Sequence, residues 1–386
     1  MIFGRRRNGN HERVTDTGQV ARPLRIGLVA PPWVPTPPPA YGGTERVVAL
    51  IAEGLAARGH DVTLVAAPGS SVPGVRVESP LDELPAEIGL PDEEWRHTMG
   101  AVEALADCEA VIDHSSLRST CMLLSAGLST AHVVHGAIDR RAAAEAADAA
   151  RNMPGLRLVA LSESQARTGP GLPFMAVCPN AIDVRGVPFR DDHDGYLAFV
   201  GRMCADKGVR EAIMLARSVG MPLRIAAKCR EANEHAYFAE HVEPFLGDGI
   251  EYLGELGEDD RWPLLAGARA LVFPIAWDEP FGMVMIEAMA TGTPVLATGR
   301  GAVPEVVRDG ATGIVRRTVD ELARCVPLLD GIDPQTCRAH VAARFSPRAL
   351  TRRYEAVAVA LAGSGVPAAG RGRRVLARVS ALGLMA

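Results

Sequence analysis

Short apolar runs alternate along the chain with longer segments whose apolar residues recur at helical spacing. Leu24–Ala30 is an apolar run that ends at two prolines, which indicates a buried strand. Residues 44–60 carry apolar side chains three and four positions apart, which predicts a helix that stops near Gly59. Residues 61–67 form the next apolar run. A strand, a helix and a strand within about 45 residues are typical of a βαβ unit, so the pattern predicts a parallel sheet.

Comparable apolar runs follow in two groups, which the polar stretch 185–194 separates. They lie at 109–114, 131–136, 156–162 and 174–180 in the first group, and at 196–202, 222–228, 250–256, 269–274 and 293–298 in the second. Because 386 residues exceed one typical hydrophobic core, we interpret the two groups as two α/β domains. A last helix is predicted over 345–363, with Ser346 as its cap before Pro347.

We therefore expect a first α/β domain over 23–184 and a second over 185–345. Residues 1–22 and 364–386 are predicted to be disordered or flexible tails. The first tail has basic residues but no long apolar core, so it does not resemble a secretory signal. The second tail holds four arginines and an apolar end. Disorder and a weak amphipathic contact with a membrane surface both stay open for it.

Composition and charge narrow the class of protein. The chain is 48% hydrophobic and 23% charged, as ordinary soluble globular proteins are, and its net charge of −5 does not favour nucleic-acid binding. The seven cysteines are scattered and have no zinc-site spacing, which indicates a reduced, cytoplasmic chain. No apolar run reaches the ~18 residues that span a bilayer, so we expect at most peripheral membrane contact. The high Ala, Arg and Gly content suggests a bacterial source, and the oligomeric state stays open.

Two glycines, Gly42 and Gly43, lie between the first predicted strand and its helix. Glycine lets the backbone approach a ligand closely, and a helix start offers unpaired N–H groups to an anion. The stretch has neither the G-x-G-x-x-G fingerprint of dinucleotide sites nor the Gly-Lys-Ser/Thr of a Walker loop. A plain turn is the alternative.

Arg202 and Lys207 follow the first strand of the second half. Ligands of doubly wound sheets bind beyond the carboxyl ends of the strands, which places both cations at the expected crevice. Arginine offers a planar fork to phosphate oxygens and lysine a mobile point charge. Two solvated loop cations are the alternative.

The stretch DEPFGMVMIEAMATGTPV at 278–295 contains Glu287 within an apolar helix predicted to begin near Gly282. Side chains on a helix lean toward its N-terminus, so Glu287 is expected to point back toward the crevice. Backbone N–H groups near Phe281, Gly282 and Met283 suit a diphosphate or a sugar hydroxyl. A carboxylate that accepts two ribose hydroxyls and a structural pair with an arginine both explain Glu287.

His114 and His135 each close an apolar run, which puts both at the crevice edge of the first half, in a functional or an idle role. Trp33 and Tyr41, in a proline-rich loop, are suited to stack on a flat acceptor or to pack as a lid. Asp192 and Asp194 form a D-x-D in the polar linker, which we interpret as solvated rather than as a metal site.

Taken together, these segments resemble glycosyltransferase family 4, the retaining nucleotide-sugar transferases of GT-B fold. The resemblance covers most of residues 24–362. It rests on PPPAYGGTERVV, on VVHG at 133–136, PNAID at 179–183, GRMCADKG at 201–208, EPFGMVMIEAMATGTPV, and GAVPEVVRDGATG at 301–313. It implies two Rossmann-like doubly wound domains that face a cleft, with the helix at 346–363 crossing back to the first domain.

The resemblance also implies roles for particular residues. Glu287 would bind the ribose hydroxyls, and Glu279 hydroxyls of the transferred sugar near C3 and C4. Arg202 and Lys207 would clamp the diphosphate, and His135 would face the sugar near the reacting carbon.

Further implied contacts come from the backbone. Gly42 and Gly43 would let the first half close over the diphosphate, and the N–H groups of Phe281, Gly282 and Met283 would contact sugar and phosphate. No metal or other cofactor is implied. The chain departs from the family at Asn180-Ala181, where relatives often carry Asn-Gly.

We therefore expect a retaining transferase that moves a sugar from a nucleoside diphosphate, most simply UDP, to a hydroxyl of a small molecule or glycan. Trp33, Tyr41 and His114 are the predicted acceptor-side residues. A nucleotide-sugar-binding protein without turnover and another GT-B enzyme, such as a sugar epimerase, are the alternatives.

Overall fold

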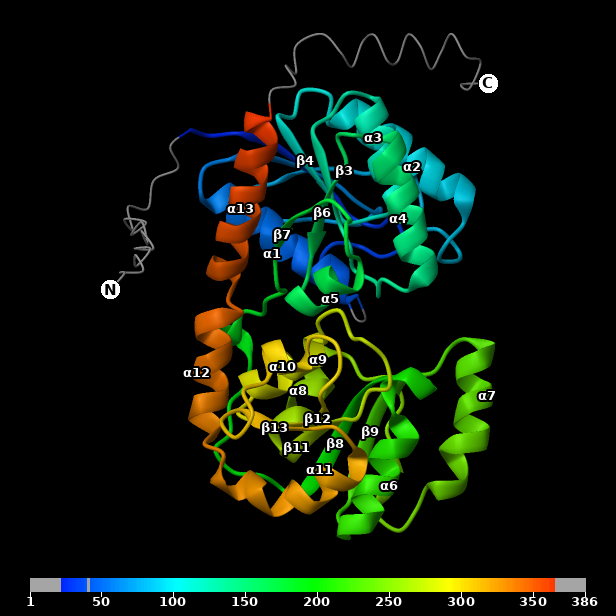
Figure 1. Ribbon diagram of the computed structural model, residues 1–386, viewed down its shortest axis with the longest axis vertical. Coiled ribbons are helices and arrows are strands. Elements are labelled where there is room, and N and C mark those ends of the chain that lie inside the picture. Colours follow the sequence, from blue (N-terminus) through cyan, green and yellow to red (C-terminus); the bar gives the residue numbers. More distant parts are fainter. Residues whose placement is uncertain (1–21, 40–41, 365–386) are drawn as a thin grey trace, which may run out of the picture.

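The computed structural model describes residues 22–39 and 42–364, which form two α/β domains, each built on a parallel sheet (Figure 1). The first sheet has seven strands in the order β3-β2-β1-β4-β5-β6-β7. These are β1 (Arg25–Val29), β2 (Asp61–Val65), β3 (Arg76–Glu78), β4 (Ala110–Asp113), β5 (Thr130–Val133), β6 (Arg157–Ala160) and β7 (Phe174–Val177). Its helices are α1 (Gly43–Ala57), α2 (Pro91–Ala104), α3 (Leu117–Ser125), α4 (Arg140–Asn152), α5 (Glu163–Thr168) and the 3₁₀ helix η1 (Val184–Gly186).

The second sheet has six strands in the order β10-β9-β8-β11-β12-β13. These are β8 (Tyr196–Arg202), β9 (Leu223–Lys228), β10 (Ile250–Tyr252), β11 (Ala268–Phe273), β12 (Val295–Thr298) and β13 (Gly313–Arg316). Its helices are η2 (Ala205–Lys207), α6 (Val209–Val219), α7 (Ala232–His241), η3 (Glu243–Phe245), α8 (Glu258–Ala266), α9 (Met283–Ala290), α10 (Val303–Val306), α11 (Val319–Cys325), η4 (Val326–Gly331) and α12 (Pro334–Arg344). The predicted class, two parallel α/β halves, is confirmed.

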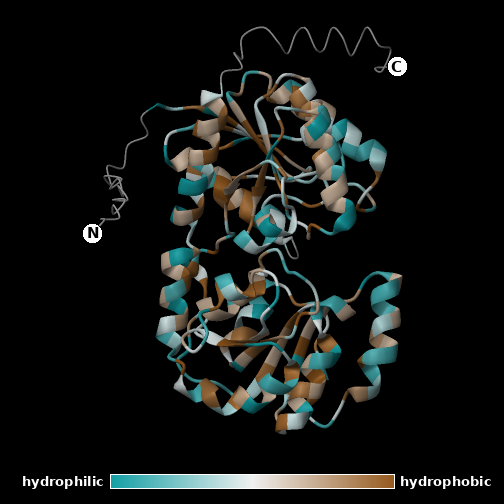
Figure 2. Cartoon of the chain, viewed as in Figure 1, coloured by the Kyte–Doolittle hydropathy of each residue, from teal (hydrophilic) through white to brown (hydrophobic). Residues whose placement is uncertain are grey.

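Both sheets reverse their strand order beside their first strand, between β1 and β4 and between β8 and β11. Ligands of open parallel sheets bind at this switch point, beyond the carboxyl ends of the strands. Apolar residues concentrate on the sheets and on the inner faces of the helices, whereas the outer faces are hydrophilic (Figure 2). The apolar runs of the sequence are therefore the strands, buried on both faces.

One strand, β3, was not expected from the sequence. It pairs only with β2 at the edge of the first sheet, and its three side chains are exposed or half-buried. An edge strand that is not buried on both faces needs no continuous apolar run, so the pattern of apolar positions does not reveal it.

The last helix, α13 (Pro347–Gly363), crosses back to the first domain and packs against α1 and β4, as predicted (Figure 1). The hydroxyl of Ser346 accepts a hydrogen bond from the backbone N–H of Ala349, which caps the helix. Beside it, the backbone N–H of Ile182 donates to the carbonyl of Phe345 at 2.9 Å. The two segments that pass between the domains are thus joined to each other.

The predicted tails lie outside the described residues, apart from their inner ends. Arg22 forms an ion pair of 2.6 Å with Glu109, and the Ser364 hydroxyl donates to the carbonyl of Leu361 at 2.5 Å. Within residues 22–39 and 42–364, none of the helices combines the length and the apolar character that a membrane span requires.

The close contact of α1 with α13 depends on Gly54. A Cβ atom at this position would lie 2.0 Å from Oγ1 of Thr351, so a larger residue requires Thr351 or the helices themselves to shift. We expect Gly54→Ala to lower the free energy of unfolding by about 1–3 kcal/mol, measured by urea denaturation. Gly331→Ala, where nothing lies within 4 Å, is the matched control and should be neutral. Adding Thr351→Ala to Gly54→Ala should recover part of the loss, and strict additivity of the two losses would contradict this explanation.

Candidate functional site

A cleft with a volume of about 480 Å³ lies between the domains, at the carboxyl ends of both sheets. Segments that follow β1, β5, β8 and β11 line it. The predicted site residues that line it are Trp33, Gly42, Gly43, His135, Arg202, Lys207, Glu279, Phe281, Gly282, Met283 and Glu287. Tyr41 lies outside the described residues, and His114 lies behind the cleft wall. Residues far apart in the sequence thus meet in one place.

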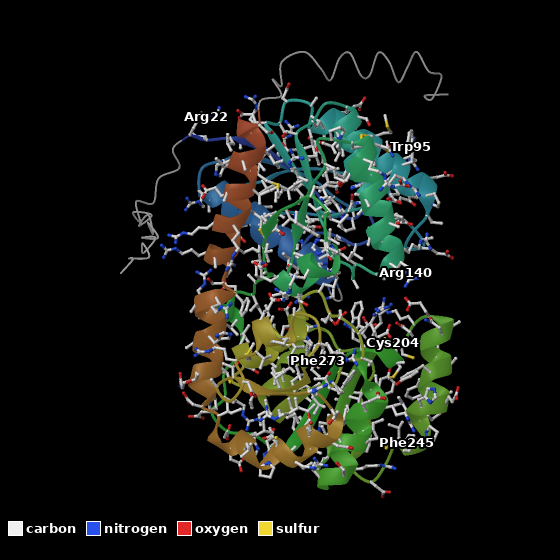
Figure 3. The ribbon with its side chains drawn as sticks, viewed as in Figure 1. Arg22, Trp95, Arg140, Cys204, Phe245 and Phe273 are labelled. Atoms are coloured by element: carbon white, nitrogen blue, oxygen red, sulfur yellow. The ribbon has the colours of Figure 1, made fainter. Side chains whose placement is uncertain are left out.

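Figure 3 shows the sides of the two domains that are turned toward each other. Arg140, the first residue of α4, lies on this side of the first domain, and Cys204, two residues after β8, lies on this side of the second. Gly43 and Met283 approach each other across the cleft, since a Cβ atom on Gly43 would lie 3.9 Å from Cγ of Met283. Glycine at this position leaves room for the second domain.

The start of α9 lies on the second domain's side of the cleft. Gly282 precedes the helix in a left-handed conformation with φ of 79°, and a Cβ atom there would lie 2.7 Å from Met285 and 3.3 Å from Phe273. Glycine is therefore required both by its backbone angle and by the space around it. The N–H groups of Met283 and Val284, the first two of this eight-residue helix, have no acceptor within the helix, and both residues line the cleft.

Glu287 is 8% exposed, and its Oε1 accepts from Nη2 of Arg261 at 3.3 Å. The contact is long and uses one carboxylate oxygen, and both residues line the cleft. The arginine pair considered from the sequence is therefore real, but it does not remove Glu287 from the cleft. Arg261 itself was missed, because it follows three acidic residues that indicate an exposed helix start.

Glu279 is bound on the same side of the cleft by two groups. Its Oε2 accepts from Lys207 Nζ at 2.5 Å and from the indole N–H of Trp277 at 3.0 Å. The ammonium group also lies 4.8 Å from the centroid of the Trp277 ring. Lys207, expected to clamp a diphosphate, is thus engaged with the carboxylate expected to bind the sugar. Trp277 lies two residues before Glu279, and nothing in the sequence marked it.

A further cation, Lys228, lies beside Arg202 at the ends of two neighbouring strands. Arg202 ends β8 opposite Lys228 on β9, and both side chains line the cleft. Lys228 forms an ion pair with Glu231, on the rim of the second domain. A lysine at the end of the next strand was a signal available in the sequence, because adjacent carboxyl ends share an edge.

On the first domain, His135 faces the cleft from the segment after β5. Its Nε2 lies 2.9 Å from Nδ1 of His114, which is 2% exposed. Burial, with a smaller contribution from His132, lowers the pKa of His135 to about 3. Burial and the neighbouring His135 also lower the pKa of His114 well below its ordinary value. The expected acceptor-side role of His114 does not fit, since a buried ring behind His135 has no direct access to a ligand.

The D-x-D of the linker does not contribute to the cleft. Asp192 and Asp194 each form an ion pair of 2.8 Å with Arg190. In the described part of the chain, no group of three or more His, Cys, Asp and Glu side chains is placed to hold a metal ion.

Part of this chain is similar in sequence to known glycosyltransferases. Residues 194–329, which cover most of the second domain, match the family model described as glycosyl transferases group 1. The chain is 33% identical over 220 residues to a glycogen synthase of Mycobacterium tuberculosis, covering 53% of this chain and 51% of that protein. It is 33% identical over 117 residues to a D-inositol 3-phosphate glycosyltransferase of Streptomyces scabiei, covering 30% of this chain and 26% of that protein. The chain thus spans about half the length, or less, of these curated relatives.

Solved structures match over nearly the whole chain. Sucrose-phosphate synthase of Thermosynechococcus elongatus superposes with a TM-score of 0.73 at 18% identity, covering 89% of this chain and 100% of that one. AviGT4, a glycosyltransferase involved in avilamycin A biosynthesis, gives 0.68 at 24% identity and covers 89% and 99%. The Anabaena protein HepE, solved in complex with UDP and glucose, gives 0.67 at 15% identity and covers 87% and 100%.

The chain has the GT-B fold. The fold class predicted from the sequence is therefore confirmed, and in this GT-B chain the cleft lies between its two Rossmann-like domains.

The lowered pKa of His135 makes the free energy of unfolding depend on pH. The unfolded chain protonates His135 below its ordinary pKa of 6.5, whereas the folded chain does so only near 3. Between these values the unfolded state binds more protons, so the free energy of unfolding should fall as pH is lowered from 6.5 toward 3. Urea denaturation from pH 7.5 to 4.5 measures the slope. His135→Gln should flatten it, and a slope unchanged by this substitution would contradict the lowered pKa.

Proposed function

We propose that this protein is a retaining glycosyltransferase of family 4, which moves a sugar from a nucleoside-diphosphate-sugar to an acceptor hydroxyl. The observation that carries the proposal is that Glu279 and Glu287 flank the start of α9 and line one cleft with Arg202 and Lys207. The match of residues 194–329 to glycosyl transferases group 1 supports the same class of activity.

The second domain holds the donor in this proposal. Glu287 accepts the ribose hydroxyls, Glu279 binds the transferred sugar, and the N–H groups of Phe281, Gly282 and Met283 contact the atoms between them. UDP is the proposed nucleotide. HepE, a GT-B neighbour, was solved with UDP and with UDP-glucose, which supports this choice.

The cations of the cleft act on the leaving group. As the bond between the sugar and the diphosphate breaks, negative charge grows on the phosphate oxygen, and Arg202, Lys207 and the start of α9 stabilise it. These groups supply the positive charge, so no metal or other cofactor is part of the proposal. Lys207 then divides its interaction between Glu279 and the diphosphate.

We propose same-face attack at the sugar. Glu279 and Glu287 already have binding roles in this proposal, and Glu255 pairs with Arg230, which favours same-face attack over double displacement through a carboxylate nucleophile. Both routes would retain the anomeric configuration. The bond from the anomeric carbon to the phosphate oxygen breaks, the bond to the acceptor oxygen forms on the same face, and the acceptor proton passes to the departing phosphate.

The first domain would bind the acceptor. Trp33, Val34 and Ile88 line its side of the cleft, and Ile88 is 74% exposed. Covering these side chains removes apolar area from water, so an acceptor with an apolar part suits this wall. A cytoplasmic location is also proposed, which the seven free cysteines support.

The proposed reaction should be visible with the purified chain. We expect UDP release from a UDP-hexose to depend on an added hydroxyl acceptor, and NMR of the product should show the anomeric configuration of the donor. An inverted product would contradict retention. Tight donor binding without product or slow hydrolysis would favour a binding protein, and conversion of the donor alone would favour an epimerase.

A binding experiment should distinguish the roles of Glu279 and Glu287. Glu287→Gln should weaken both UDP and UDP-sugar by roughly tenfold or more, about 1.4 kcal/mol, because the nucleotide part is common to both ligands. Glu279→Gln should weaken the UDP-sugar without lowering UDP affinity, because loss of this charge releases Lys207 for the diphosphate. Isothermal titration calorimetry measures both. Glu240→Gln is the control, since that side chain is 77% exposed and lies outside the cleft. Equal loss of UDP affinity in both cleft variants would contradict the division.

A further inference from the structure

His114 is conspicuous because it is a buried polar ring that contacts the site without lining it. His114 and His135 follow β4 and β5, which are neighbours in the first sheet. The register pairs Asp113 with His132, so the two segments leave the sheet side by side. The ring centroids of His114 and His135 lie 5.2 Å apart, and Nδ1 of the first faces Nε2 of the second at 2.9 Å.

The far side of His114 is closed by the crossing helix. The ring of Tyr354, on α13, lies 5.6 Å from that of His114 and is fully buried. Nε2 of His114 and the hydroxyl of Tyr354 are both buried and have no hydrogen-bond partner among the described residues. His132, His135 and Tyr354 are the titratable groups around the His114 ring, and each of these histidines has a lowered pKa through burial.

The contact between the two rings limits where the protons can lie. A neutral imidazole carries one N–H and one lone pair, so the 2.9 Å contact admits two arrangements. In one of them the unpartnered Nε2 of His114 is the lone pair, and the proton of His114 lies on Nδ1, where it donates to Nε2 of His135. The proton of His135 is then on its Nδ1, the other nitrogen of a ring that lines the cleft.

We propose that His114 is a positioning residue that holds His135 in the Nδ1–H tautomer, so that His135 presents a hydrogen-bond donor to an oxygen of the bound sugar. This role rests on the proposed transferase function, and it adds the direction of the hydrogen bond. At this nitrogen His135 donates and does not act as a base. The crossing helix contributes by burying His114 behind Tyr354.

The first test reads the tautomer directly and needs no activity. The full-length chain, labelled with ¹⁵N in histidine, is recorded by long-range ¹H–¹⁵N NMR at pH 7.5. The signals of His135 are assigned by their loss in His135→Gln. We expect a protonated Nδ1 and an unprotonated Nε2 on His135. A protonated Nε2 would overturn the proposal, whether or not the protein turns over a nucleotide-sugar.

The second test uses two substitutions of His114. His114→Asn retains an amide N–H near the position of Nδ1, whereas His114→Leu retains no donor. We expect His114→Leu to lower kcat by about tenfold or more at an unchanged KM for the donor, and His114→Asn to stay within about threefold of the parent. His193→Asn, at an exposed histidine of the linker, is the control.

These outcomes separate the two proposals. Denaturation curves show whether each His114 variant is folded. If both folded variants lose kcat equally while His135 keeps the Nδ1–H tautomer, His114 does not act through the tautomer and the inference is wrong. If no donor and acceptor pair gives a product, the proposed function fails, and the NMR result alone decides the tautomer.

Discussion

The turn at Gly282 is the constraint on which the site depends. It takes the chain from β11 into a helix that is buried on nearly all sides, and it needs a left-handed backbone in a space that admits no side chain. Because the helix starts there, its first residues line the cleft, with Glu279 just before them and Glu287 just after the first turn. The same short segment therefore supplies donors for an anion and acceptors for hydroxyls.

Buried carboxylates need hydrogen-bonding or charged partners, and both glutamates of the cleft have them. Glu287 has Arg261, and Glu279 has Lys207 and Trp277. Each pair compensates the cost of burial, and each leaves charge of both signs at the surface where a ligand would bind. A diphosphate would compete with Glu279 for Lys207, so ligand binding and the rearrangement of this pair are linked.

The first domain contributes two neighbouring neutral histidines, one in the wall of the cleft and one behind it. His135 and His114 are held uncharged by burial, and α13 closes the space behind them with Tyr354. The helix that returns from the second domain is thus more than a connection. This helix packs on α1 at Gly54, and its Tyr354 lies against the His114 ring. The same helix therefore contributes to the stability of the first domain and to the surroundings of the two histidines.

Much of this was predictable from the order of the residues alone. Strands buried on both faces leave continuous apolar runs, so the two parallel sheets and the last helix could be predicted, and cations after β8 could be assigned to the crevice because parallel strands share one edge. The edge strand β3 could not, since its side chains are not fully buried.

The partners within the site were decided only by the tertiary structure. Glu287 had two explanations, and the fold shows one of them, a pair with Arg261 of α8, while it keeps both residues in the cleft. His114 and His135 looked equivalent as strand-end residues, yet one became a wall of the cleft and the other a support behind it. Periodicity records whether a position is buried, but not which distant side chain meets it there. The residue types along the chain therefore determined the fold and the kinds of chemical group at the cleft, whereas their pairing and protonation depended on the packing of the two domains.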